Sequence, residues 1–180
     1  MVKRRSDGTL IFKDHPEFRP NLKPAQVLKA GAFGGTYFRP IYSKITKHKH
    51  KNAWKEFPKS WFKDVNIKTH ISSSTCNKNI NKYKAKSGTS LEYWESKKWI
   101  KKQDPYGWFQ WYCRFYQGRR TVDDERQIKR WAGVASQNGR FRKRLVNLIG
   151  TKKKLKDHTI SPVIRQLLLQ WAYELKPQDL

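Results

Sequence analysis

The stretch Asp104-Pro-Tyr-Gly-Trp-Phe-Gln-Trp-Tyr-Cys-Arg-Phe-Tyr-Gln-Gly118 decides the fold of this chain. Large rings recur in it at the helical spacing i, i+3, i+4 and i+7: Trp108, Trp111, Tyr112 and Phe115. A second apolar set follows the same period: Phe109, Cys113 and Tyr116. Asp104 with Pro105 is typical of a helix start, and Gly118 of a helix end. A helix that is apolar on two faces packs inside a domain, so the stretch predicts a central helix.

Helix signals continue on both sides of this stretch. Four further helix starts are indicated. A capping box marks Thr89-Ser-Leu-Glu92, and an acidic first turn follows Thr121 at Asp123 and Asp124. A break in the pattern precedes a start at Gly139-Arg140, and a proline marks the start at Ser161-Pro162. Gly150 and Pro177 mark helix ends. Residues 89–176 are therefore predicted to form a bundle of about five short helices.

The first half of the chain carries weaker signals. Residues 1–20 are predicted to form a basic N-terminal arm, and residues 21–88 a loop-rich half with basic loops. Short helices are expected at 24–30 and 58–65, whereas Pro40 makes residues 36–42 extended, which leaves room for a small β element. The fold class expected is mainly α, in one domain over residues 1–180, with the helical bundle packed on this irregular half.

Charge and aromatic content point to the partner. The chain has 40 Lys and Arg against 14 Asp and Glu, a net charge of +26, together with 8 Trp, 8 Tyr and 9 Phe. The positive charges of such a surface repel one another, and this repulsion is normally offset by a bound polyanion. An anionic membrane and an acidic protein remain alternatives, but nucleic-acid bases offer flat faces for aromatic rings, and lipids do not. Nucleic acid is the predicted partner, and no membrane partner is expected.

The most basic segment runs from residue 126 to 156, with eleven Lys and Arg and no Asp or Glu. Its helix from Arg140 can present cations to phosphates while its apolar side packs inward. This helix and the one before it are separated by the break at residues 137–139. Two helices joined in this way are also compatible with a helix-turn-helix. The alternative is a solvated face with a nuclear-localisation patch at 152–156. The predicted nucleic-acid contacts are Arg39, Arg119, Arg120, Arg140, Arg142, Lys143, Arg144, Lys152, Lys153 and Lys154.

A glycine-rich string is the most enzyme-like feature of the first half. In it the residues expected near a ligand are Gly34, Gly35, Thr36 and Tyr37. Adjacent glycines allow close approach to a phosphate, but the string matches neither a P-loop nor a dinucleotide-binding motif. A tight turn that packs its aromatic neighbours inward is the favoured interpretation.

The aromatic residues divide into two expected groups. Those at helical spacing are assigned to the core: Trp108, Trp111, Trp131 and Trp171. Those near predicted turns or helix ends are expected to be more exposed: Trp54, Trp61 and Tyr106. Exposed rings of this kind can stack on unpaired bases.

Catalytic and metal-binding signals are sparse. The candidate acids for a nucleic-acid enzyme are Asp104, Asp123 and Asp124, each of which also suits a helix-capping role. The two cysteines lack metal-ligand spacing, so no metal and no cofactor is expected.

The sequence thus favours a non-enzymatic nucleic-acid-binding protein, with DNA preferred over RNA. The alternatives are a small base-excision or strand-processing enzyme and a structural RNA-binding subunit of ribosomal type. The absence of an apolar run near 20 residues and of a secretory leader favours an intracellular protein, nuclear if eukaryotic. Oligomeric state is not predicted.

Overall fold

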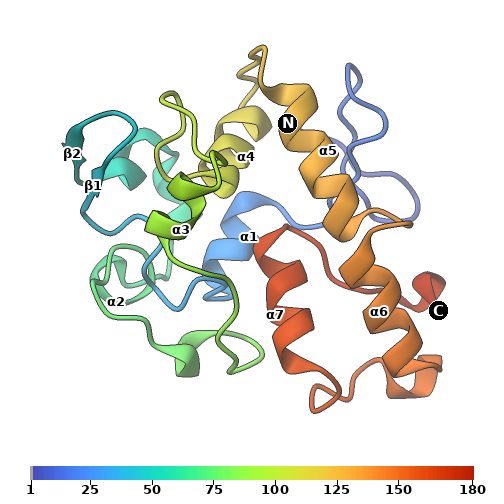
Figure 1. The fold of residues 1–180 in the computed structure, drawn as a ribbon. Helices are drawn as coiled ribbons and strands as arrows, with labels where there is room; N and C mark the ends of the chain where they lie inside the picture. The colour runs from blue at the N-terminus through green and yellow to red at the C-terminus, as the bar shows by residue number, and fades with distance from the viewer. Residues whose placement is uncertain (1) are drawn as a thin grey trace.

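The fold of residues 2–180, described from a computed structural model, is mainly α with a two-stranded sheet, which confirms the expected fold class at that level (Figure 1). The helices are α1 Pro24–Lys29, α2 Ile67–His70, α3 Leu91–Ser96, α4 Trp108–Tyr116, α5 Asp124–Ala135, α6 Arg140–Ile149 and α7 Pro162–Gln170. The strands are β1 Ile41–Ser43 and β2 His48–His50. Short 3-10 helices connect them at Ala53–Glu56, Lys59–Phe62, Lys78–Ile80, Lys152–Lys154 and Pro177–Asp179.

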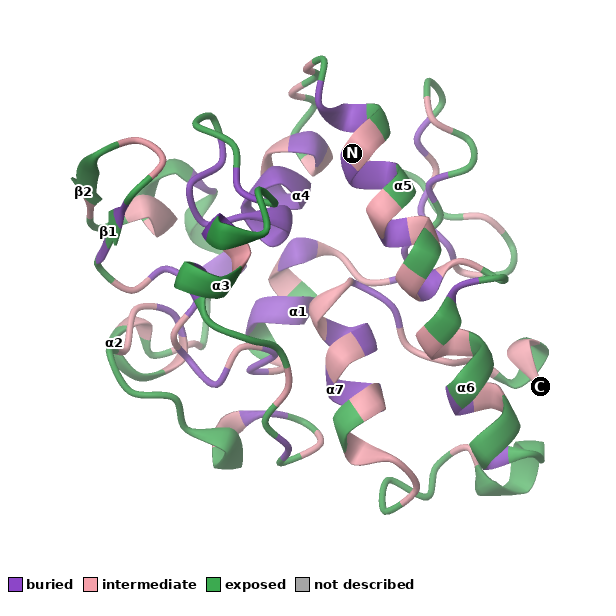
Figure 2. Ribbon diagram, viewed as in Figure 1, coloured by how far each residue is buried: buried purple, intermediate pink, exposed green. Residues whose placement is uncertain are grey.

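Helix α4 lies in the core, as its two apolar stripes predict. Trp111, Tyr112 and Phe115 are fully buried, and Figure 2 shows α4 as a buried element. Phe18 packs edge-on against Trp131 of α5, with ring centroids 5.1 Å apart, and also contacts these three α4 rings. Leu10 and Phe12 are buried as well, so residues 2–20 pack against the same core rather than extending as an arm.

The small β element is a hairpin. β1 and β2 pair antiparallel, with Ile41 opposite His50 and Ser43 opposite His48. Buried Glu95 of α3 accepts hydrogen bonds from the Ser43 hydroxyl and the Lys44 backbone N–H. This carboxylate ties the hairpin to the helical half of the chain.

Four helix expectations are wrong. The helix expected at 58–65 is only a short 3-10 helix, Lys59–Phe62. α4 begins at Trp108, with Gly107 at φ +91° as its N-cap, because Asp104 is held in ion pairs instead. α3 is capped by Ser90, whose hydroxyl accepts the Tyr93 N–H, and not by Thr89. α7 ends at Gln170, because Ala172 adopts a left-handed conformation (φ +57°) that a helix cannot continue through.

Two of the three rings expected to be exposed are in the core. Trp61 stacks on Phe57 with ring planes 7° apart, and Tyr106 donates its hydroxyl to the Arg39 carbonyl at 2.8 Å. Both are buried, and Trp54 is half-buried. Proximity to a turn did not predict exposure, because aromatic neighbours from distant segments cover these rings.

The turn between α5 and α6 requires a residue without a side chain. A Cβ on buried Gly139 would lie 2.5 Å from the Val134 carbonyl carbon and oxygen, whereas a Cβ on exposed Gly133 meets nothing within 4 Å. The glycine expected at this break thus allows the start of α6 to pack against the end of α5.

This contrast predicts opposite effects of one substitution. We expect Gly139→Ala to lower the free energy of unfolding by about 1–3 kcal/mol through overpacking against α5. Gly133→Ala, inside helix α5, should raise it by about 0.5–1 kcal/mol because alanine restricts the unfolded chain. Urea denaturation of the two variants checks both signs, and equal effects would contradict the packing at Gly139.

Over residues 2–180, no helix has both the length and the apolar character that crossing a membrane needs. Cys113 is buried in α4 and Cys76 is exposed, and both are free thiols.

Candidate nucleic-acid interface

Helix α6 and the 3-10 helix that follows it present a row of exposed cations. Leu145 and Ile149 are buried and anchor α6, while its outward side faces solvent (Figure 2). The exposed cations here form what we call the basic surface: Lys143, Arg144, Lys152, Lys153 and Lys154. None of these side chains forms an ion pair with a carboxylate of residues 2–180. The surface is therefore open to phosphates.

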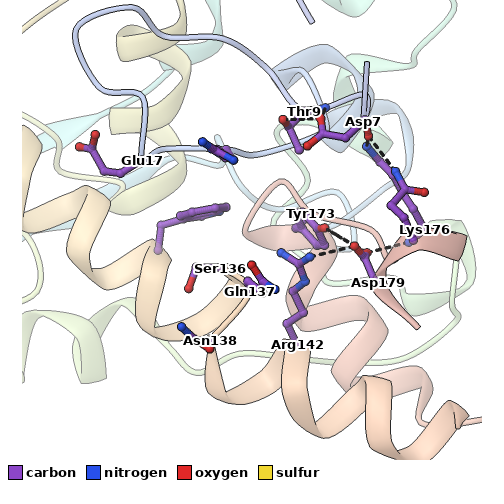
Figure 3. Close-up of a pocket in the computed structure, with 13 residues that line it drawn as sticks. Asp7, Thr9, Glu17, Ser136, Gln137, Asn138, Arg142, Tyr173, Lys176 and Asp179 are labelled. Carbon is purple, nitrogen blue, oxygen red and sulfur yellow. Dashed lines mark hydrogen bonds and ion pairs between the residues drawn. The ribbon is translucent and has the colours of Figure 1, made fainter. Parts of the chain in front are cut away.

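Arg142, although on the same helix, points into the protein. Figure 3 shows its guanidinium directed at Asp179, with an N···O distance of 2.8 Å. The guanidinium also lies over the Tyr173 ring, and the Tyr173 hydroxyl donates to the same carboxylate. The structure thus uses Arg142 to hold the C-terminal segment against α6.

The predicted contacts Arg119 and Arg120 also have partners within the chain. Arg119 pairs with Asp104 at 2.6 Å. Arg120 pairs with Asp14 and lies 3.7 Å above the Phe115 ring centroid. Hydrogen bonding from Arg120 lowers the pKa of the Asp14 carboxyl. Both arginines connect segments of the fold, which leaves them less able to reach an external anion.

The three candidate catalytic acids each have structural partners. Asp104 is inaccessible and accepts from Arg114 and Arg119. Asp123 pairs with Arg126, and Asp124 accepts from the Trp111 indole at 2.8 Å and from the Thr121 backbone at 2.8 Å. Nowhere in residues 2–180 do three His, Cys, Asp or Glu side chains form a group that can hold a metal ion.

The glycine-rich string forms a tight turn. Gly34 and Gly35 have φ values of +59° and +88°, and their carbonyls accept from Asn77 and Ser73 respectively. A Cβ on Gly35 would overlap the Thr69 carbonyl oxygen. Tyr37 is buried, donates its hydroxyl to the Tyr106 carbonyl at 2.7 Å and has its pKa raised well above the usual range by that burial. The glycines are thus explained by packing, as the favoured interpretation expects.

The same string forms one wall of a groove. Two adjoining hollows, of about 370 and 590 Å³, share lining residues that include Phe33, Tyr37 and Trp94, and together we call them the aromatic groove. The smaller hollow continues along Gly34, Thr36 and Arg39. The larger one is lined by rings from five segments: Phe33, Tyr37, Tyr93, Trp94, Trp99, Trp108, Phe109, Phe141 and Trp171.

The charge of the aromatic groove has one sign. No Asp or Glu of the described chain lines either hollow. The cations that line them are Arg39, Lys86, Lys129, Arg130 and Arg140. Two of its rings are well exposed, Tyr93 at 42% and Trp99 at 38%, and they pack edge-to-face 5.8 Å apart. Exposed rings and cations without acids are the combination found in single-strand-binding sites.

Arg130 of α5 is the most unusual charge in the groove. Its guanidinium lies 5.2 Å from the Trp99 ring centroid and 5.5 Å from that of Trp171. Its hydrogen-bond partner is the Gln127 amide oxygen at 2.9 Å, and among residues 2–180 no carboxylate forms an ion pair with it. Burial, reinforced by the nearby Arg126 charge, lowers the pKa of Arg130 to about 10.

The structure therefore divides the predicted contacts into three sets. Arg39 and Arg140 line the aromatic groove, the basic surface is exposed, and three arginines are held internally: Arg119, Arg120 and Arg142. The sequence interpretation missed Tyr93, Trp99 and Arg130 as site residues. A usable signal was present in the sequence, since three aromatic rings and four lysines stand together in residues 93–102.

Comparisons of the chain with protein-family models, with curated proteins and with solved structures found no match.

Proposed function

We propose that this protein binds nucleic acid without chemically changing it, and that it holds the phosphate backbone, with DNA favoured over RNA, through the basic surface. The helical half, residues 89–176, serves in this proposal as a bundle that supports the surface. The observation that carries the proposal is the set of exposed cations on α6 and the 3-10 helix Lys152–Lys154, which lack carboxylate partners within residues 2–180.

The distribution of ion pairs supports this proposal. The acids are engaged mainly by arginines: Arg114, Arg119, Arg120, Arg126 and Arg142. Within the described chain, the lysine that pairs with a carboxylate is Lys82, with Glu174 at 2.6 Å. Most lysines thus keep their charge available at the surface, where phosphate contacts release counterions.

The candidate acids favour binding over catalysis. A general base needs a lone pair directed at substrate, whereas Asp104 and Asp124 are buried and accept hydrogen bonds from the protein. The carboxylates of Asp104 and Asp124 already have a structural explanation, so we assign them no chemistry.

Fluorescence anisotropy tests the proposal. Labelled duplex DNA, single-stranded DNA and hairpin RNA of equal length are titrated with the chain over a range of salt concentrations, with heparin as a competitor. We expect the affinity to fall steeply with salt, one nucleic-acid form to be preferred over heparin, and every strand to stay intact on a denaturing gel. Equal binding to all four polyanions would refute a specific nucleic-acid function. A cut strand or an abasic product would show an enzyme instead, and preference for the hairpin would indicate the RNA-binding alternative.

A further inference from the structure

The aromatic groove contains a cation, Arg130, that has no carboxylate partner within residues 2–180. Arg130 is half-buried, and a cation partly removed from water normally has a carboxylate partner, because losing hydration is costly. Arg126, one turn earlier on α5, follows this rule by pairing with Asp123 through two hydrogen bonds. Arg130 instead contacts two ring faces and an amide oxygen. A negative group that enters the groove would therefore give Arg130 the ionic partner that it lacks.

The rings around Arg130 indicate that the ligand has a flat ring as well as a negative charge. Tyr93 and Trp99 are exposed on the same wall, and the floor behind them is formed by Trp108 and Trp171, with ring centroids 4.6 Å apart. Such faces accept flat partners by stacking, which contributes about 1–3 kcal/mol per base in single-strand-binding proteins. A ligand that combines a flat ring with an adjacent negative charge fits this site, and a nucleotide has both.

The groove also adjoins the basic surface. Arg140, the first residue of α6, lines the groove with Phe141, and its guanidinium lies 4.6 Å from the Phe141 ring centroid. Lys143 and Arg144 follow on the next turn of the same helix. A backbone running along α6 can therefore pass its next nucleotide into the groove.

We propose that the aromatic groove binds an unpaired nucleotide, with the base stacked on the exposed ring of Tyr93, beside Trp99, and the phosphate on Arg130. This inference rests on the proposed nucleic-acid function and names the form that the site prefers, which is a single-stranded segment or end. A paired base is excluded from the groove, because its faces are covered by its neighbours in the duplex.

The first test removes the charge. Arg130→Gln should weaken binding of a labelled oligo(dT) of about 12 nucleotides by about tenfold, because a charge-assisted phosphate contact is lost. Arg130→Lys should recover only part of the affinity, since lysine lacks the planar fork. Lys68→Gln removes the same charge from an exposed position outside the groove and should change affinity little. Arg130 also contacts the Trp99 and Trp171 rings and the Gln127 amide, so the melting temperature of each Arg130 variant is measured to show that the fold is retained.

The second test separates base from phosphate. An abasic oligonucleotide of equal length carries the same phosphates and no bases, so the wild-type chain should bind it more weakly than oligo(dT), by about fivefold or more. Tyr93→Ala should reduce this difference, and Tyr93→Phe, which keeps the ring face, should retain it.

The outcomes distinguish the two proposals. Loss of oligo(dT) affinity in Arg130→Gln and Tyr93→Ala, with Lys68→Gln unaffected, supports the groove. Unchanged affinity in both variants, while neutralising the basic surface weakens binding, overturns the groove and leaves the nucleic-acid function standing. No binding of any nucleic acid by the wild-type chain overturns both.

Discussion

Neutralising the basic surface, with Gln at all five of its positions, will weaken duplex DNA binding on the order of 100-fold at about 0.1 M salt. Each phosphate contact normally releases about one counterion from the DNA, and a variant that lacks the contact does not release it. The slope of log affinity against log salt should therefore become shallower by about 4. These side chains are exposed and lack carboxylate partners in residues 2–180, so the melting temperature should not fall. Anisotropy at several salt concentrations gives both quantities.

The matched control removes the same charge elsewhere. Five exposed lysines of the first half are replaced by Gln: Lys13, Lys29, Lys59, Lys63 and Lys68. This variant should keep most of the salt dependence, because long-range charge is screened beyond about 10 Å at such salt concentrations. An equal loss in both variants would mean that net charge alone attracts the DNA, and would remove the basic surface as the interface.

Arg142 provides a control on α6 itself. Arg142→Gln should leave the salt slope close to that of the wild type and lower stability instead, because Arg142 contacts Asp179 and Tyr173. A simple reading of the sequence would group Arg142 with Arg144, and their different roles are visible only in the fold.

Local signals predicted local structure well. The break at Gly139, the start of α6 at Arg140 and the start of α7 at Pro162 follow from the glycine and proline that stand there. The position of α4 in the core followed from its two apolar stripes. Each of these features depends on residues within one or two turns of each other.

Contacts between distant segments explain what the sequence could not predict. Asp104 has the local pattern of a helix cap, but Arg114 and Arg119 offer it two guanidinium groups, and the helix starts at Trp108 instead. Ion-pair partners are set by tertiary geometry, which spacing along the chain does not contain.

The aromatic groove illustrates the same limit for the site. Its walls come from residues 32–41, 74–100, 106–109, 129–141 and 167–171, which only the fold brings together. Trp61 near a turn is buried, whereas Trp99, also near a helix end, is exposed. Whether a ring is covered depends on which segments pack against it. The composition therefore predicted that aromatic rings could stack on bases, but not which rings are exposed to do so.

Asp104→Asn will lower the free energy of unfolding by about 3 kcal/mol, the largest effect expected of a single polar substitution in this chain. Asparagine has nearly the same shape, so packing is preserved while the negative charge is lost. Arg114 and Arg119 would then remain partly buried with less compensation, although Glu56 still pairs with Arg114 at 2.8 Å. Urea denaturation followed by tryptophan fluorescence measures the change.

Asp14→Asn is the matched control, because it removes the same group from another aspartate–arginine pair. The Asp14 side chain is 49% exposed against 1% for Asp104, so solvent already screens its attraction to Arg120, and the loss should be below about 1 kcal/mol. The Asp14 carboxyl has a lowered pKa, so the contribution of its pair should be present above the ordinary aspartate pKa and disappear as pH falls through the lowered value. Equal losses in the two variants would contradict a structural role for the buried Asp104, and would reopen Asp104 as a residue retained for chemistry, because its burial and two arginine partners would then no longer account for it.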